Sequence, residues 1–297
     1  MTAAMTAAMT ALSRRTLLLA PALLAALPRA RAASPRRIVS IGGAVTEILY
    51  RLGRGGEIVG VDSTSQHPAE ALRTKANVGY VRALGAEGIL SLRPTHVIAV
   101  EGAGPPDALR LVEQAGVRIV RVPEEFGEEG TVRRVRTVAE AVDAQAEGAA
   151  LAAEIEEGFA KLSAVRAKVT RPAKALFVLS LQNGRPVVGG RGTAADAMLA
   201  LAGAENAASG LTGWKPLSDE GLIAAAPEAI VTMAHGPGGD APDPFALPAF
   251  AATPAAAKRR LIVMDGVYLL GFGPCAPSAA LELLAALHPD RAGTARP

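Results

Sequence analysis

The chain has 297 residues, half of them hydrophobic, which is enough to bury one large core or two smaller ones and excludes a disordered protein. Its formal net charge is +3, but the first 32 residues contain four arginines and no acidic residue. Without these arginines, 27 basic side chains face 28 acidic ones, a net charge of −1. The basic character therefore belongs to the start of the chain and argues against a nucleic-acid-binding protein.

Residues 1–32 have the pattern of a cleaved export signal. Arg14 and Arg15 precede an apolar run rich in leucine and alanine, and Ala30 and Ala32 place small residues two apart, as at a cleavage site. We expect cleavage after Ala32. The arginine pair favours twin-arginine export, with an ordinary Sec signal as the alternative. Two prolines interrupt the apolar run, which argues against a membrane anchor.

From residue 36 to residue 130, short β-type runs alternate with helical segments, a pattern typical of a parallel sheet covered by helices. The predicted strands are 37–41, 58–61, 95–100 and 117–122. The predicted helices are 44–52, 86–91 and 106–115, the last with a proline in its first turn. We expect residues 36–130 to form an N-terminal lobe.

Residues 131–170 are predicted to form one long connecting helix. The segment has no proline, and Val135, Val138 and Val142 recur at helical spacing. It ends just before Pro172, where a helix naturally stops. A continuous helix of some 25 residues would be about 37 Å long, so we expect a rigid connection.

Residues 171–297 repeat the pattern of the first lobe. The predicted strands are 175–181, 229–233 and 261–264, and the last predicted helix is 277–287. Another helix is expected to begin near Thr193, with Asp196 three residues on as its capping partner. These elements predict a C-terminal lobe.

Three segments of the first lobe carry a resemblance to a known family. Val59–Pro68 places His67 in a turn directly after a buried-type strand, and Val78–Pro94 and Glu101–Pro106 give this turn its setting. Together they resemble the periplasmic haem-binding proteins of bacterial haem ABC importers. The resemblance extends from about Arg36 to the last helix. It implies an α/β fold of two Rossmann-like lobes with central parallel sheets, joined by one long rigid α-helix, and the periodicities agree with it.

The resemblance also implies a function in iron acquisition. A protein of this kind is an exported periplasmic monomer that captures haem, its transported ligand, in the interlobe cleft. It delivers haem to an inner-membrane ABC permease with its ATPase, and an outer-membrane haem receptor system is a further expected partner. The same fold with cobalamin or a ferric siderophore as cargo is the first alternative.

Two other classes stay open from the sequence: an enzyme built on the same fold, and a partner-binding protein that has lost its cargo. The chain contains no Gly-x-Ser-x-Gly, His-Glu-x-x-His or Gly-Lys-Ser/Thr motif, which argues against the enzyme. We therefore expect a binding protein and no covalent chemistry.

His67 is the predicted iron ligand. Members of the resembling family usually have a tyrosine at this position, and the alternative for His67 is a solvated turn histidine. A neutral imidazole suits both oxidation states of iron, so we expect a higher reduction potential than with a phenolate. His235, at the end of predicted strand 229–233, is the candidate second ligand, because ligands commonly lie at the carboxyl ends of such strands. The alternative for His235 is a histidine that caps the loop. One shared iron and two separate haems both remain open.

Cations are expected near the haem propionates. Arg73, Lys75 and Arg82 are the candidates, with a solvated surface charge as the alternative for each. Arg82 is preferred because it lies beside Tyr80 in the resembling stretch. Gly104, in the resembling turn, is a further expected pocket residue.

Gly271–Pro277 resembles a pocket loop of the second lobe, with Phe272 and Gly273 as expected pocket residues. Relatives usually have an arginine after the proline of this loop, and this chain has Cys275. A rim cation is therefore missing, and a thiol is expected near the cavity. A small half-buried thiol without a ligand role is the alternative.

Glu87 and Glu220 each follow a loop and open a predicted helix, one in each lobe. The resemblance implies that such acids dock onto arginines of the membrane permease. The alternative is the ordinary placement of an acid at a helix N-terminus, worth about 0.3–1 kcal/mol.

Overall fold

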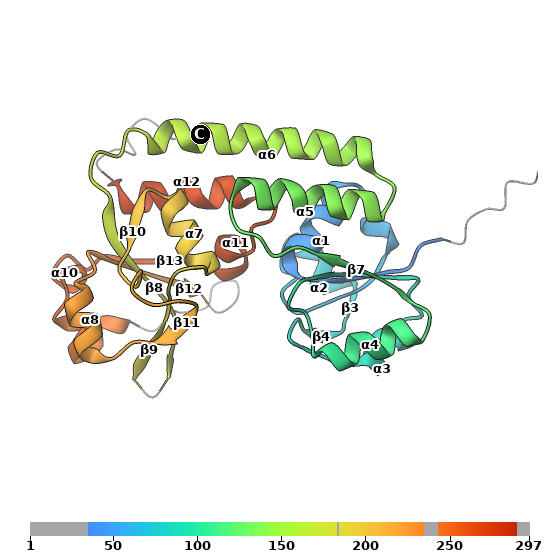
Figure 1. Ribbon diagram of the computed structural model, residues 1–297, viewed down its shortest axis with the longest axis horizontal. Helices are drawn as coiled ribbons and strands as arrows, with labels where there is room; N and C mark the ends of the chain where they lie inside the picture. The colour runs from blue at the N-terminus through green and yellow to red at the C-terminus, as the bar shows by residue number, and fades with distance from the viewer. Residues whose placement is uncertain (1–34, 183, 235–242, 290–297) are drawn as a thin grey trace, which may run out of the picture. The chain divides into compact units, whose positions relative to one another are not determined.

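The computed structural model describes residues 35–182, 184–234 and 243–289. The expected export signal and His235 lie outside the described residues. From Arg36 onward the chain forms one compact unit. Its described residues form two large sheets, each with its own helices, which make up the two lobes expected from the sequence, and one small hairpin (Figure 1).

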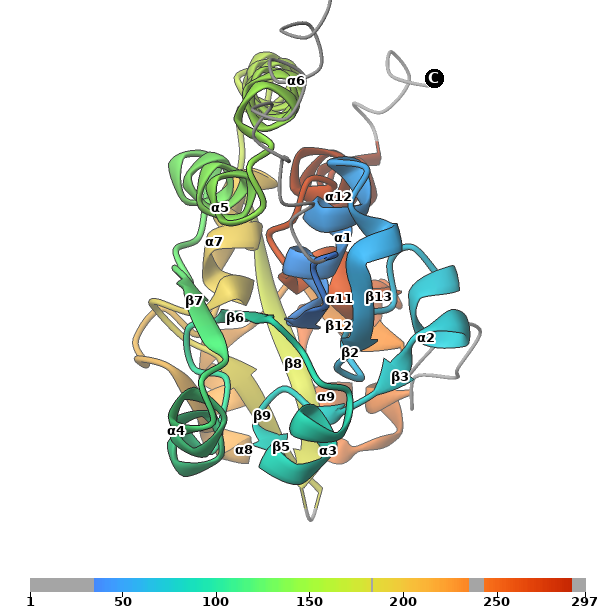
Figure 2. The same ribbon diagram turned by 90° about the vertical axis from the view of Figure 1, so that its right-hand side faces the viewer.

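The sheet of the N-terminal lobe is entirely parallel, in the order β3-β2-β1-β6-β7. Its strands are β1 (Ile38–Ile41), β2 (Ile58–Val61), β3 (Ala76–Asn77), β6 (His96–Val100) and β7 (Arg118–Val122). Its helices are α1 (Gly43–Arg51), α2 (Glu70–Thr74), α3 (Ala86–Ser91) and α4 (Pro106–Gln114), and β4 (Gly79–Tyr80) pairs with β5 (Ala83–Leu84) in a separate small hairpin. Figure 2 shows β6 and β7 side by side, with α4 below β7. The predicted strands and helices of this lobe are confirmed to within two residues.

The sheet of the C-terminal lobe is mixed, which corrects the expectation of a parallel sheet. Its strands are β8 (Ala173–Gln182), β9 (Arg185–Gly189), β10 (Ala204–Asn206), β11 (Trp214–Pro216), β12 (Ala229–Ala234) and β13 (Leu261–Asp265). The order is β11-β9-β8-β12-β13, with β10 also paired to β8. β9 runs antiparallel to β8 and β11, because the tight connection from Gln182 to Arg185, with Gly184 at φ 77°, returns the chain as a hairpin.

The helices of this lobe are α7 (Ala194–Leu201), α8 (Asp219–Ala225), α9 (Pro248–Ala251), α10 (Pro254–Ala257), α11 (Gly266–Leu270) and α12 (Ala276–Leu287). The predicted capping pair at the start of α7 is confirmed. The Thr193 hydroxyl accepts a hydrogen bond from the amide of Asp196 at 3.2 Å, and the Asp196 carboxylate accepts one from the amide of Gly192 at 3.2 Å.

The segment between the lobes contains two helices, which corrects the single helix expected over residues 131–170. They are α5 (Glu128–Ala141) and α6 (Gln145–Arg166). The break comes at Asp143, whose φ of 51° is left-handed and incompatible with a continuing helix. The long helix is therefore α6, whose 22 residues span about 33 Å. Figure 1 shows α6 running beside both α5 and α12.

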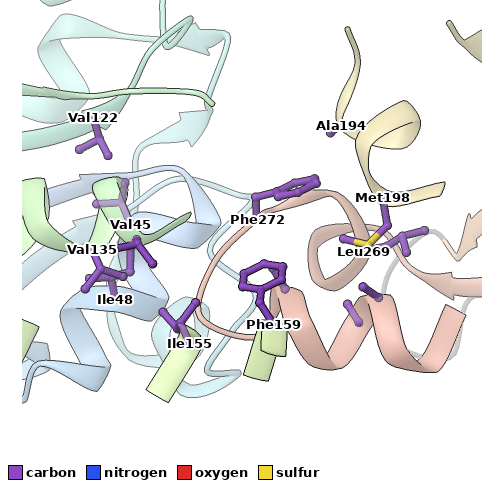
Figure 3. Packing of buried hydrophobic residues seen from close by; sticks show 14 of the residues in the cluster. Val45, Ile48, Val122, Val135, Ile155, Phe159, Ala194, Met198, Leu269 and Phe272 are labelled. Carbon is purple, nitrogen blue, oxygen red and sulfur yellow. The ribbon is translucent and has the colours of Figure 1, made fainter. Parts of the chain in front are cut away.

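The largest hydrophobic cluster joins the two lobes. It takes buried residues from α1 and α5, from α6, and from α7 and α12. In Figure 3, Phe159 of α6 and Phe272 lie in the middle of this cluster, with Ile48 on one side and Met198 on the other. Across the described ranges, no helix has both the length and the apolar character needed to cross a bilayer.

Candidate functional site

The turn that carries His67 is built around Asp62, which is fully buried at the end of β2. One carboxylate oxygen accepts hydrogen bonds from the amide of Gly42 at 2.7 Å and the hydroxyl of Ser65 at 3.0 Å. The other accepts from the amide and hydroxyl of Thr64 at 3.0 and 2.6 Å. Four bonds to one buried carboxylate fix the path of the turn. His67 is thus presented by a rigid support.

The imidazole of His67 reaches the other lobe. Its Nε2 lies 3.3 Å from Oδ1 of Asp265, and the two side chains are 44% and 29% exposed. Asp265 caps α11, and the same Oδ1 accepts a hydrogen bond from the amide of Tyr268 at 2.7 Å. The imidazole is therefore half exposed at a contact between the two lobes.

Tyr268 is a neighbour that sequence reasoning missed. Its ring centroid lies 6.3 Å from that of His67. Burial, followed by the charge of Glu282, raises the pKa of the Tyr268 phenol to about 12. The group therefore stays a neutral phenol near neutral pH.

Cys275 makes a contact between the two lobes. Its Sγ lies 2.7 Å from a carboxylate oxygen of Glu47 on α1. Burial, together with the hydrogen bond and charge of Glu47, raises the pKa of the Cys275 thiol to about 12. Burial also raises the pKa of the Glu47 carboxyl, although the bond from Cys275 partly opposes this. A thiol held neutral in this way is a poor metal ligand.

Two neighbouring residues of this loop, Phe272 and Gly273, are packed tightly against the protein. Phe272 is fully buried and its ring lies 5.1 Å from that of Phe126. A Cβ at Gly273 would lie 2.5 Å from a carboxylate oxygen of Glu47, so only glycine fits there without a shift. Phe272 and Gly273 therefore close the core between the lobes.

Arg134 of α5 anchors the same loop and was also missed. The side chain is 1% exposed, and its guanidinium donates to the backbone oxygens of Gly271 at 3.0 Å, of Phe272, and of Pro123 at 3.3 Å. Burial lowers the pKa of Arg134 from its usual value. The carbonyl dipoles compensate this buried cation and tie α5 to the C-terminal lobe.

The expected propionate cations lie on the surface of the N-terminal lobe. Tyr80 and Arg82 are exposed on the β4–β5 hairpin, and Arg73 is exposed on α2. Lys75 donates to the backbone oxygen of Gly55 at 2.8 Å, which draws it into the lobe.

Gly104 has a structural part in this region. It is buried, its amide donates to the oxygen of Val81, and its own oxygen accepts from the amide of Leu84, both at 2.9 Å. These two bonds hold the hairpin that carries Tyr80 and Arg82. Gly104 therefore supports the hairpin through its backbone.

Glu87 and Glu220 are exposed near the start of α3 and α8. Ser218 caps α8 by accepting a bond from the amide of Gly221 at 3.1 Å. Hydrogen bonds from its own backbone amide and from Ser218 hold the pKa of Glu220 below its usual value. Both carboxylates are thus exposed to solvent.

Three cavities in the described part, of about 390, 320 and 210 Å³, do not include His67. The largest lies at the amino ends of the C-terminal sheet, lined by Arg171, Glu228 and Arg260 among others. Ligands of such sheets bind at the opposite, carboxyl ends. Within the described ranges, no three His, Cys, Asp or Glu side chains gather as a metal site. Any iron held here must bring its other ligands with it.

Residues 38–268 match the model of the periplasmic binding protein family. The chain belongs to that family. Its members are solute-binding proteins and not enzymes, and the same holds for this chain. The resemblance seen in the sequence is confirmed at this level.

The chain is also similar to individual known proteins. The structure of the periplasmic haem-binding protein RhuT from Roseiflexus sp. RS-1 is 39% identical, with a TM-score of 0.81 over 86% of this chain and 99% of that one. YvrC of Bacillus subtilis, described as an uncharacterized ABC transporter substrate-binding lipoprotein, is 27% identical over 67% of this chain, and the match spans 63% of the length of YvrC. A vitamin B12-binding protein of Vibrio campbellii is 26% identical over 67% of this chain and 71% of its own length.

Proposed function

We propose that this protein is an exported haem receptor that captures haem between its lobes and delivers it to an ABC permease of the inner membrane. The observation that carries the proposal is the half-exposed imidazole of His67, held on a turn fixed by buried Asp62 and directed at the other lobe. Similarity to RhuT supports haem as the cargo, because RhuT is a periplasmic haem-binding protein with 39% identity to this chain.

The residues present suit such a cargo. His67 supplies one nitrogen donor, and the porphyrin itself supplies four, so no cluster of protein ligands is required. Arg82 and Arg73, both exposed on the same lobe, are the cations proposed to face the propionates, with Tyr80 beside them. His235 remains a proposal for a second donor. Phe272, Gly273 and Cys275 are better assigned to the contact between the lobes than to the haem wall.

Delivery requires a docking surface and a route of export. We assign docking to Glu87 and Glu220, one exposed acid near the start of a helix in each lobe. YvrC, an ABC transporter substrate-binding lipoprotein, supports an ABC permease as the partner. The arginine-rich start of the chain supports export to the periplasm.

Cobalamin is the second candidate cargo, supported by similarity to vitamin B12-binding proteins at 26% identity. Titration of the purified mature protein with hemin and, separately, with cyanocobalamin distinguishes the two. Haem as cargo predicts a shifted and sharpened Soret band that saturates with hemin, and no quenching of Trp214 fluorescence by cyanocobalamin beyond its inner-filter effect. Saturable binding of cyanocobalamin with no hemin response would reject the proposal.

A further inference from the structure

His67 and Asp265 lie 198 residues apart in the chain, on different lobes, and meet through Nε2 and Oδ1 at 3.3 Å. We propose that Asp265 is a positioning residue that holds the imidazole until cargo arrives and then gives it up to the iron. Capture would then be an exchange of partners at His67, from a carboxylate of the second lobe to a metal. The inference rests on the proposed haem function.

The two partners exclude each other on chemical grounds. A neutral imidazole has one nitrogen that donates a proton and one that accepts. Contact with the Asp265 carboxylate needs the proton on Nε2, whereas iron needs the lone pair of a ring nitrogen. Nδ1 is next to the carbon that joins the ring to Cβ, so a broad porphyrin meets the backbone there sooner than at Nε2. The nitrogen that suits haem is therefore the one that Asp265 contacts.

Little free energy is needed to break the contact between His67 and Asp265. A separation of 3.3 Å is long for a charge-assisted hydrogen bond, and side chains that are 44% and 29% exposed interact weakly in water. Asp265 is itself fixed, because its Oδ1 also accepts from the amide of Tyr268 at 2.7 Å and caps α11. On exchange, the imidazole turns while the carboxylate stays in place.

The test is a cycle of four proteins titrated with hemin: the natural sequence, Asp265→Ser, His67→Ala, and the double variant. Serine caps a helix nearly as well as aspartate but is too short to reach His67, so the start of α11 is preserved. We expect Asp265→Ser to tighten hemin binding about two- to five-fold, the range of a weak exposed pair. In the His67→Ala background the same change should have no effect.

The dependence on His67 separates positioning from a general structural role. Weaker binding by Asp265→Ser in the presence of His67, or an equal change in both backgrounds, would overturn the exchange. Asp265→Asn, which keeps the size and the cap but removes the charge, should lie between the natural protein and the serine variant. Thermal unfolding of each variant verifies the fold. If His67→Ala itself leaves hemin binding and its spectrum unchanged, the ligand assignment fails, and this is distinct from failure of the exchange alone.

Discussion

At the scale of single residues, burial and one shared hydrogen bond together shift the pKa values of Cys275 and Glu47. The thiol and the carboxyl share a short hydrogen bond between the loop before α12 and helix α1. Each is disfavoured in its charged form, by burial and, for the thiol, also by the neighbouring carboxylate. The pair is stable near neutral pH, where the thiol keeps its proton.

This arrangement predicts a loss of stability in alkali. The pKa of Cys275 rises from 9.0 to about 12 on folding, so above pH 9 the unfolded chain loses a proton that the folded one keeps. The unfolded state then binds fewer protons, and the free energy of unfolding falls as the pH rises from 9 toward 12. Melting temperatures of the natural protein and Cys275→Ala between pH 7 and 11 check this.

The alanine variant should lose less stability over that range than the natural protein. Part of the decline will remain, because the pKa of Tyr268 is raised in the same direction. Alkylation by iodoacetamide at pH 8 should be slower than for a free thiol and faster after Glu47→Gln. A decline as steep in Cys275→Ala as in the natural chain would contradict the assignment.

The sequence indicated some candidate site residues and missed others for a definite reason. His67, Glu87 and Glu220 lie in short local patterns shared with the resembling family. Asp265 and Tyr268 lie beside His67 although they are about 200 residues away in the chain, and no local sequence pattern indicates such a contact. Arg134 offered one signal. It is a charged residue on the apolar side of a predicted helix, next to Val135.

At the scale of elements, the two departures from the predicted fold both occur at turns. The sequence Asn183-Gly184 between two apolar runs is a strong hairpin signal, and it explains why β9 returns antiparallel to β8. The break between α5 and α6 has no such signal, because Val142 and Ala144 fit a helix and only Asp143 tolerates the left-handed turn. The other predicted strands and helices agree with the periodicity and with the family resemblance, whereas short elements such as β3, β10 and β11 were not predicted.

The pair α5 and α6 depends on a close approach at Gly148. A Cβ there would lie 2.3 Å from the Cβ of Ala139 on α5. Gly148→Leu should therefore force the helices apart and lower the free energy of unfolding by about 1–3 kcal/mol, as overpacking does. Urea unfolding followed by circular dichroism measures it.

Ala149→Leu is the matched control, because Ala149 is exposed on the same helix. It should change the free energy of unfolding by less than about 0.5 kcal/mol. Equal effects of the two leucines would show that helix packing at Gly148 is not tight.

At the scale of the whole molecule, α6 and the cluster that joins the lobes favour a fixed arrangement of the two docking acids. Arg134 and the Cys275–Glu47 contact reinforce this connection. A rigid body can present Glu87 and Glu220 to a two-sided partner at a constant spacing.

Reversal of both charges, Glu87→Arg with Glu220→Arg, should abolish haem uptake by cells that express the importer. The new arginines would then face the arginines of the permease and repel them. Hemin affinity of the purified variant should stay within about two-fold of the natural value, since Glu87 and Glu220 lie on α3 and α8 and not on the turn that carries His67. Growth on haem as the iron source measures uptake. The control reverses Glu113 and Glu205, an exposed acid in each lobe, and should leave uptake intact. Uptake that survives the first reversal would reject the docking assignment.

The central claim is that His67 binds the iron of haem, and a hemin titration of the natural protein beside His67→Ala tests it most directly. His96→Ala is the control. His96 lies at the start of β6, and its Nδ1 is 2.9 Å from the hydroxyl oxygen of Thr95. The account predicts a saturable Soret band for the natural protein and for His96→Ala, and a changed spectrum with affinity reduced about tenfold or more, some 1.4 kcal/mol, for His67→Ala. A protein that stays colourless in excess hemin, or an alanine at 67 that leaves the spectrum unaltered, would contradict it.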